Sequence, residues 1–237
     1  IVALSTLQAS NLGTAQVRTL TAAQLAALET QDLAAFKTQQ LAALGTAQFV
    51  LLNSDQIAGL SVAQVFSLTT QHIAVLLDDQ VRALETRDLA ALRTAQLQAF
   101  NSAQLGAIST AQLQGMTGAQ LASLNTLQFQ SLLTSQITSL TTLQVAALAT
   151  GQIASLTADQ LAALNTGEIA ALKAAQIGAL NTAQVVLLST DQITALTSIQ
   201  VAAMSTMQLS SLTSDQIRAL TTEEFAALSP APLTALG

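Results

Sequence analysis

The sequence has no cysteine, tryptophan or tyrosine, only one histidine, and only 8% charged residues in a chain of 237. Without cysteine the chain has no disulfide and no thiolate for catalysis or metal binding, and neither redox compartment is favoured. Seven basic and thirteen acidic residues give a net charge of −6, which provides no positive surface for a phosphate backbone. Nucleic acid is therefore not expected as a partner.

Long apolar runs are also missing. Runs such as Ile73 to Leu77 extend over about five residues, whereas about 20 are needed to cross a bilayer. We therefore expect no transmembrane segment. The chain opens on Ile1 without a basic segment that leads into an apolar one, so we expect no signal peptide in these residues and expect Ile1 to begin a fragment or a processed chain.

What the sequence does have is an eight-residue repeat. Every eighth residue from Leu4 to Leu236 is large and apolar, and this position is called a, with the following seven called b to h. Position e is Gln in 23 of 29 units, c is Thr or Ser in 22, f is aliphatic or Phe in most units, and h is Ala, Ser or Gly in 24. We interpret residues 1–237 as a single array of 29 units from Leu4 to Ala235, with degenerate end units at 1–11 and 228–237.

A second level of repetition lies above the octad. Residues 20–59 match residues 156–195 at 24 of 40 positions, including residues outside the consensus such as Lys37 with Lys173. These matches indicate duplication of a block of units as a whole, and we find no linker between domains.

An eight-residue period excludes a continuous helix and a continuous strand. In an α-helix a stripe repeating every eight residues rotates by about 80° per unit, and in a strand a and f fall on opposite faces. The backbone must therefore reset once per unit. Because Ala, Leu and Gln favour helices, we predict a very short helix followed by a sharp turn in each unit.

The polar positions predict where each helix begins. Position b is Ser, Thr, Asn or Gly in 21 of 29 units, and these residues are preferred at the N-cap. With b as the N-cap, Gln at e stands at the third helical position of a capping box, while a and f form a hydrophobic staple. All thirteen acids occupy positions b to e, near the positive end of the helix dipole. Thr at c is an alternative N-cap, and the sequence does not decide between the two.

These patterns predict an all-α fold, a solenoid of very short helices of about two turns, one per octad, that forms an elongated superhelix. Positions f and a are the expected core. The small residue at h fits either a close approach to a neighbouring turn or a tight chain reversal, and both explanations stay open at this point.

No group of residues has the composition of a catalytic site, so we expect no enzyme activity, no cofactor and no metal site. His72 replaces Gln at e, where a neutral imidazole is a hydrogen-bonding substitute for the amide; the alternative is a base or metal ligand. The charge-dense region of residues 78–93 lacks the spacing of a Ca²⁺ loop and is interpreted as a solvated face with ion pairs. The Gln column is expected mainly to cap helices, although amides at a fixed spacing can also bond from unit to unit.

Some apolar residues stand at positions that are normally polar, which suggests a contact surface for another copy or a partner protein, although local packing explains them equally well. They are Leu127, Leu133, Leu143, Ile199 and Met207. The Thr column at c raises the further alternative of an ice-binding face, which the varied and charged residues at b and d disfavour.

The unit Leu-x-Thr-x-Gln-(Ile/Leu/Val)-x-Ala, as in residues 140–147, resembles repeats of very large exported proteins of Gram-negative bacteria, described as adhesin-like or haem-utilisation-like. The resemblance covers essentially the whole chain and implies a secreted or cell-surface array. It carries no pattern of axial ligands for haem. We therefore expect a structural scaffold, either a stalk or spacer or a self-assembling filament element, whose partners are other copies or other proteins. The alternative is an α-solenoid that binds proteins or peptides.

Overall fold

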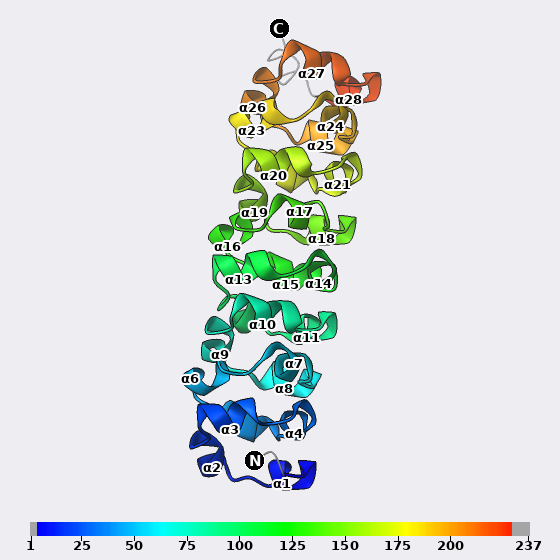
Figure 1. The fold of residues 1–237 in the computed structure, drawn as a ribbon. Coiled ribbons are helices and arrows are strands. Elements are labelled where there is room, and N and C mark those ends of the chain that lie inside the picture. The colour runs from blue at the N-terminus through cyan, green and yellow to red at the C-terminus, as the bar shows by residue number, and fades with distance from the viewer. Residues whose placement is uncertain (1–3, 229–237) are drawn as a thin grey trace. The chain divides into compact units, whose positions relative to one another are not determined.

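Each octad forms one short helix in the computed structural model, which describes residues 4–228 (Figure 1). Within the described residues there are 28 helices of four to six residues and no strand. The first fourteen are α1 (Thr6–Ser10), α2 (Thr14–Arg18), α3 (Ala22–Ala26), α4 (Thr30–Ala34), α5 (Thr38–Ala42), α6 (Thr46–Phe49), α7 (Ser54–Ala58), α8 (Val62–Ser67), α9 (Thr70–Ala74), α10 (Asp78–Ala83), α11 (Thr86–Ala91), α12 (Thr94–Leu97), α13 (Ser102–Ala107) and α14 (Thr110–Gln114).

The remaining helices continue the same pattern. They are α15 (Gly118–Ala122), α16 (Thr126–Gln130), α17 (Thr134–Ile137), α18 (Thr142–Ala147), α19 (Thr150–Ala154), α20 (Ala158–Ala163), α21 (Thr166–Ala171), α22 (Ala174–Gly178), α23 (Thr182–Leu187), α24 (Thr190–Thr194), α25 (Ser198–Ala202), α26 (Thr206–Ser210), α27 (Ser214–Ala219) and α28 (Thr222–Ala227). The predicted solenoid of short helices is thus confirmed, and the expected degenerate unit at 228–237 lies almost wholly outside the described residues.

Every helix begins at position c, with b as its N-cap. Ser61 is typical: its backbone is extended, with φ −75° and ψ 154°, and its hydroxyl accepts the N–H of Gln64. The Gln64 side chain in turn accepts the N–H of Ser61, which completes the predicted capping box. The alternative of Thr at c as the N-cap is therefore wrong, because c is already the first helical residue.

The chain reverses between helices without special backbone conformations. Residues at a and b are extended, as for Leu84 with φ −60° and ψ 133° and Glu85 with φ −74° and ψ 157°. No described residue has a positive φ. Two extended residues therefore reset the backbone in each octad. Because extended backbone is open to any L-residue, the turn needs no glycine.

The helices form two compact units, one within residues 1–116 and one within residues 117–237. Inside each unit, helices three apart in the sequence pack against each other: α4 against α7 and α7 against α10 in the first, α15 against α18 and α18 against α21 in the second. Figure 1 shows these helices in successive turns of the chain. The helices of consecutive octads thus follow a superhelical path.

Hydrogen bonds between successive turns give the length of one turn. The Gln56 amide nitrogen bonds the carbonyl of Leu28, and that of Gln176 bonds the carbonyl of Leu148. Both pairs are 28 residues apart, and 28 residues are three and a half octads. Position e of one turn therefore lies over position a of the turn before.

The core consists of the side chains at f and a, as predicted. Residues such as Ile57 at f and Leu60 at a are completely buried. Burial is only partial at Leu4, Leu12 and Leu20 in the first turn of the first unit and at Ile217 and Phe225 in the last described turn of the second. Full burial of two such side chains contributes roughly 3 to 6 kcal/mol per octad. Because octads in adjacent turns provide this burial, each octad depends on its neighbours in those turns.

Position h approaches the turn before closely, which decides between the two explanations for its small size. A Cβ added to Gly59 would stand 2.1 Å from Cγ2 of Thr30, and one added to Gly115 would stand 2.0 Å from Cγ2 of Thr86. Both pairs join h to the c position 29 residues earlier. Chain reversal needs no small residue at h, because h has ordinary right-handed helical angles, as in Ala35 with φ −80° and ψ −9°.

Candidate functional site: the glutamine column

The Gln side chain at e makes contacts in two directions, which Gln56 shows fully. Its Oε1 accepts the N–H of Asn53, 2.9 Å away, within its own capping box. Its Nε2 donates to the carbonyls of Leu25 and Leu28, both at 2.8 Å, in the turn before. The side chain is only 1% exposed. A buried amide is thus hydrogen-bonded on both sides, as burial of a polar group requires.

We call this arrangement the glutamine clamp. The same arrangement joins e to backbone carbonyls 28, and 30 or 31, residues earlier along both units. It is formed by Gln40, Gln48, Gln56, Gln64, Gln80, Gln96, Gln104 and Gln112 in the first unit. In the second unit it is formed by Gln152, Gln160, Gln176, Gln184, Gln192, Gln200, Gln208 and Gln216.

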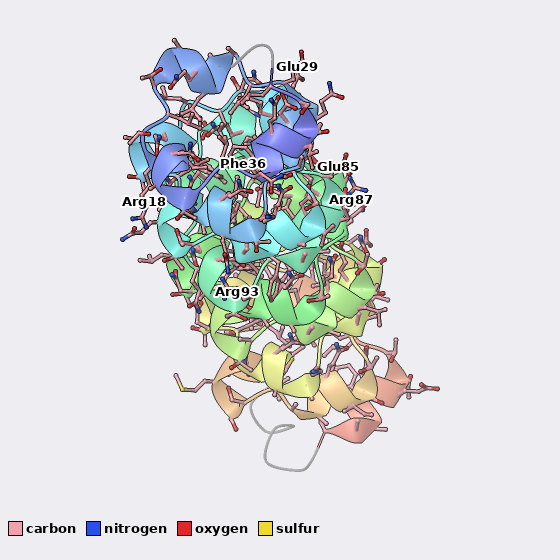
Figure 2. All side chains as sticks on the ribbon, turned by 90° about the horizontal axis from the view of Figure 1, so that it is seen from below. Arg18, Glu29, Phe36, Glu85, Arg87 and Arg93 are labelled. Atoms are coloured by element: carbon pink, nitrogen blue, oxygen red, sulfur yellow. The ribbon has the colours of Figure 1, made fainter. Side chains whose placement is uncertain are left out.

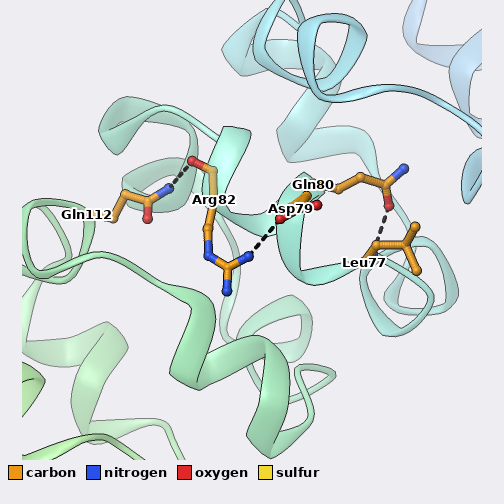
Figure 3. Close-up of polar contacts among 5 residues, drawn as sticks. All are labelled: Leu77, Asp79, Gln80, Arg82 and Gln112. Carbon is orange, nitrogen blue, oxygen red and sulfur yellow. Dashed lines mark hydrogen bonds and ion pairs between the residues drawn. The ribbon is translucent and has the colours of Figure 1, made fainter.

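Figure 3 shows the two halves of the clamp in neighbouring turns. Gln80 accepts the backbone N–H of Leu77 at 2.8 Å, which is the capping half. Gln112 reaches back and donates to the carbonyl of Arg82 at 3.3 Å, and it also bonds the carbonyl of Leu84. The acceptors are backbone atoms, so the clamp does not depend on which side chains occupy the turn before.

Sequence reasoning identified the capping half of the clamp and gave too little weight to the other half. Capping was expected to be the main role, yet the buried Gln residues also hold successive turns together. One signal was present in the sequence: capping alone is satisfied by Glu as readily as by Gln. The strong preference for Gln at e therefore indicated a need for the amide donor.

His72 occupies the column as a substitute for Gln, as predicted. The N–H of Thr69 donates to Nδ1, 3.3 Å away, and Nε2 lies 2.9 Å from the carbonyl of Leu44, 28 residues earlier. The neutral tautomer with the proton on Nε2 satisfies both contacts. The ring also stacks on Phe49, with 4.7 Å between the ring centroids. Among residues 4–228 no group of acids and histidines is arranged to hold a metal ion.

Four acids occupy the same column, and for two of them, Asp88 and Glu168, the structure shows only the capping half of the clamp. Asp88 accepts the N–H of Glu85 at 3.0 Å, and Glu168 accepts the N–H of Asn165 at 2.8 Å. The second oxygen of each, Oδ1 of Asp88 and Oε1 of Glu168, is buried without a hydrogen-bond partner. Burial, the largest cause in both cases, raises the pKa of both carboxyl groups.

The charge-dense region of residues 78–93 agrees in part with its interpretation as a solvated face. Arg82 pairs with Asp79, and Arg87 with Glu85, each at 2.7 Å and with all four side chains exposed. Figure 2 shows Glu85 and Arg87 at the periphery of the first unit. Asp88 corrects the interpretation, because position e turns its side chain into the interior, where it is fully buried.

Arg93 is held differently from the other basic residues of this region. Its guanidinium lies 5.2 Å from the ring centroid of Phe66, and its Nη2 donates to the carbonyl of Leu68 at 3.3 Å. Cation–π contacts at exposed sites contribute about 0.5–1 kcal/mol. Arg93 therefore covers an exposed aromatic side chain in the turn before.

The five apolar residues of the expected contact surface are all exposed, but they do not share one face. Leu143 and Ile199 are 82% and 73% exposed and are separated by 56 residues, which is about two turns. Leu127 precedes Leu143 by 16 residues, which is more than half a turn, so it points away from that pair. Met207 lies about three turns after Leu127 and so faces the same side as Leu127. Leu133 stands at another position of the octad, as the N-cap of α17. By this spacing Leu143 and Ile199 lie on one side of the second unit, about two turns apart, and the other three residues do not join them.

The repeat is matched by a known family model. The model described as the ALTTAQ repeat matches residues 25–62, 81–118, 161–198 and 198–230, which is more than half of the chain. The chain belongs to the ALTTAQ repeat family. A comparison with curated proteins finds no match.

The six letters of the family's description correspond to six structural positions of the ALTTAQ chain, from h to e. Residues 59–64 illustrate them: a small residue close to the turn before, a core Leu, the N-cap, the first helical residue, an outward residue and the clamp. An octad of this family is therefore one helix with its caps and its tie to the previous turn. Within residues 4–228, no helix combines the length and the hydropathy that crossing a bilayer requires.

Proposed function

We propose that this ALTTAQ array is a structural scaffold without catalytic activity of its own, acting as a stalk or spacer of an exported bacterial surface protein. The glutamine clamp supports this proposal. Because its acceptors are backbone carbonyls, the clamp forms whichever octads become neighbours, and the length of the array can change without loss of these bonds. The resemblance to repeats of exported proteins supports the location at the surface or outside the cell.

A spacer acts through its length, which gives a direct test. Duplication of residues 137–192 adds 56 residues, or two turns, and packed helices lie about 8–10 Å apart. Small-angle scattering should therefore show a maximum dimension longer by about 16–20 Å, with an unchanged cross-section. An isotropic increase of the particle, or a compact globule for the original chain, would contradict the proposal.

A second candidate is side-by-side association of copies into a filament. The observation that favours it is the exposed pair of Leu143 and Ile199, which lie about two turns apart on one side of the second unit. Sedimentation velocity of the double variant Leu143→Glu, Ile199→Glu tests it, with Leu127→Glu, Met207→Glu as the matched control. Association lost only in the first variant supports this candidate, and a monomeric original chain rules it out.

A further inference from the structure

We propose that Glu168 and Asp88 are proton-dependent clamps: each ties its turn to the turn before only while its carboxyl group carries a proton. Glu168 lies in the second unit and Asp88 in the first. The proposal concerns how firmly turns are held and does not depend on whether the array is a spacer.

The groups opposite Glu168 are acceptors. Gln160 bonds the carbonyl of Leu132 and Gln176 that of Leu148, each 28 residues earlier. The same spacing places the carbonyls of Leu140 and Ile137 opposite Glu168. An ionised carboxylate only accepts hydrogen bonds, so it cannot bond these carbonyls, whereas a protonated carboxyl group donates one O–H.

The geometry around Glu168 fits a carboxyl group that must carry a proton to bond the turn before. Its Oε2 completes the capping box with Asn165, as Gln does elsewhere. Its Oε1, the atom that stands where Gln has Nε2, is buried and unpartnered. A proton on this oxygen would make Glu168 equivalent to Gln in shape and would restore one of the two donor bonds of the clamp.

The helices packed around Glu168 offer no positive charge to stabilise the ionised form. The helices packed against α21 are α18, which has no ionisable side chain, and α24, whose only one is the exposed Asp191. The helix α17, which ends beside the expected acceptors, has none either. Burial raises the pKa of the Glu168 carboxyl group, and the N–H of Asn165 opposes this only in part.

Asp88 has the same arrangement with a side chain one methylene shorter. Its Oδ1 is buried and unpartnered, and the same spacing places the carbonyls of Leu60 and Ile57 opposite Asp88. The packed helices α8 and α14 carry no ionisable group. Burial raises the pKa of Asp88, and the charge of Glu85 adds to the rise while that of Arg87 opposes it.

The sign of the pH dependence follows from a folded-state pKa that is raised. Below the usual pKa of the free carboxyl group, 4.5 for Glu168, both folded and unfolded chains hold the proton and the carboxyl group can donate its one bond to the turn before. Between this value and the raised pKa, only the unfolded chain releases its proton, so folding becomes less favourable as the pH rises. Above the raised pKa the folded chain also releases its proton and loses the bond to the turn before. The contribution to stability is therefore present in acid and lost toward neutral pH.

Hydrogen exchange of the full chain, from about pH 4.5 to about pH 8, tests the proposal. At neutral pH, α21 and residues 137–140 should open roughly tenfold more often in the original chain than in Glu168→Gln, which has the full clamp at every pH. The difference should shrink toward acid. The matched control is Asp159→Asn on the neighbouring helix α20, which should leave the profile unchanged.

Three outcomes would overturn the proposal. The first is an equal pH dependence of local opening in the original chain and in Glu168→Gln. The second is a neutral-pH stability that rises with added Ca²⁺ or Na⁺ in the original chain but not in Glu168→Gln, which would assign the site to a cation. The third comes from the converse variant, Gln176→Glu, if it folds without acquiring a further loss of stability toward neutral pH.

Discussion

At the scale of single residues, the Gln at position e explains more of the structure than any other side chain. It has one oxygen to accept the N–H of the cap and one NH₂ group with two donors, and the structure uses all of these in Gln56. His72 retains the acceptor and one donor, and the buried acids Asp88 and Glu168 retain only the acceptor when ionised. These substitutes therefore all keep the acceptor for the cap and differ in the number of donors that they supply.

Comparison of two Gln residues separates the two halves of the clamp. Gln24 is exposed and forms only its capping box, whereas Gln56 is buried and also bonds the turn before. We expect Gln24→Ala to lower the free energy of unfolding by about 0.5–1 kcal/mol, and Gln56→Ala by about 2–4 kcal/mol because the N–H of Asn53 and the carbonyls of Leu25 and Leu28 each lose a hydrogen bond. Urea unfolding of both variants measures the difference, and equal losses would show that the bonds between turns contribute nothing.

At the scale of the helix, the capping pattern could be predicted to within one residue. Ser, Thr, Asn and Gly at b, acids in the first turn and Gln at the third position all belong to one octad, so the sequence contains every partner of these local interactions. The role of h could not be predicted in the same way, because its partner belongs to another turn. Sequence spacing alone does not tell which octads become neighbours.

The structure reveals a matched pairing between h and the c position 29 residues earlier. Position h is bulky at Leu51 and Leu187, and the 29-residue spacing pairs these with Ala22 and Ala158 in place of the usual Thr. In the pair of Gly118 and Ala147 the side chain at c is also small, since a Cβ on Gly118 would stand 2.4 Å from that of Ala147. Once the 29-residue spacing is known, these pairs can be recognised in the sequence as neighbours in successive turns.

This pairing predicts a rescue experiment. Gly59→Leu should lower the free energy of unfolding by about 1–3 kcal/mol, because the new side chain meets Thr30 at the junction of α4 and α7. Adding Thr30→Ala recreates the arrangement of Leu51 with Ala22 and should recover most of the loss, although Thr30→Ala alone brings no gain. Thermal unfolding of the two single variants and the double variant gives the coupling, and additive effects would refute the pairing.

At the scale of the whole chain, the octad period determines each helix but not the number of octads per turn. That number depends on the angle between consecutive helices, which is set by the packing of f and a side chains against other turns. The helices, their caps and the core positions could therefore be predicted from the sequence, whereas the 28-residue spacing and the second half of the clamp required the structure.

The backbone acceptors of the clamp make a prediction about insertions within a unit. Insertion of one complete octad after Leu148 shifts the pairing of the Gln residues that bond across this point, such as Gln160 and Gln176, by one octad. Each of them still finds carbonyls at f and a of another octad, so we expect cooperative unfolding with only a small change in melting temperature. Insertion of nine residues instead puts every such Gln out of register by one residue, which leaves buried amides and carbonyls unpaired at about 1–3 kcal/mol each. Calorimetry of the two variants compares them directly, and equal stability would show that the register of the clamp does not hold the turns together.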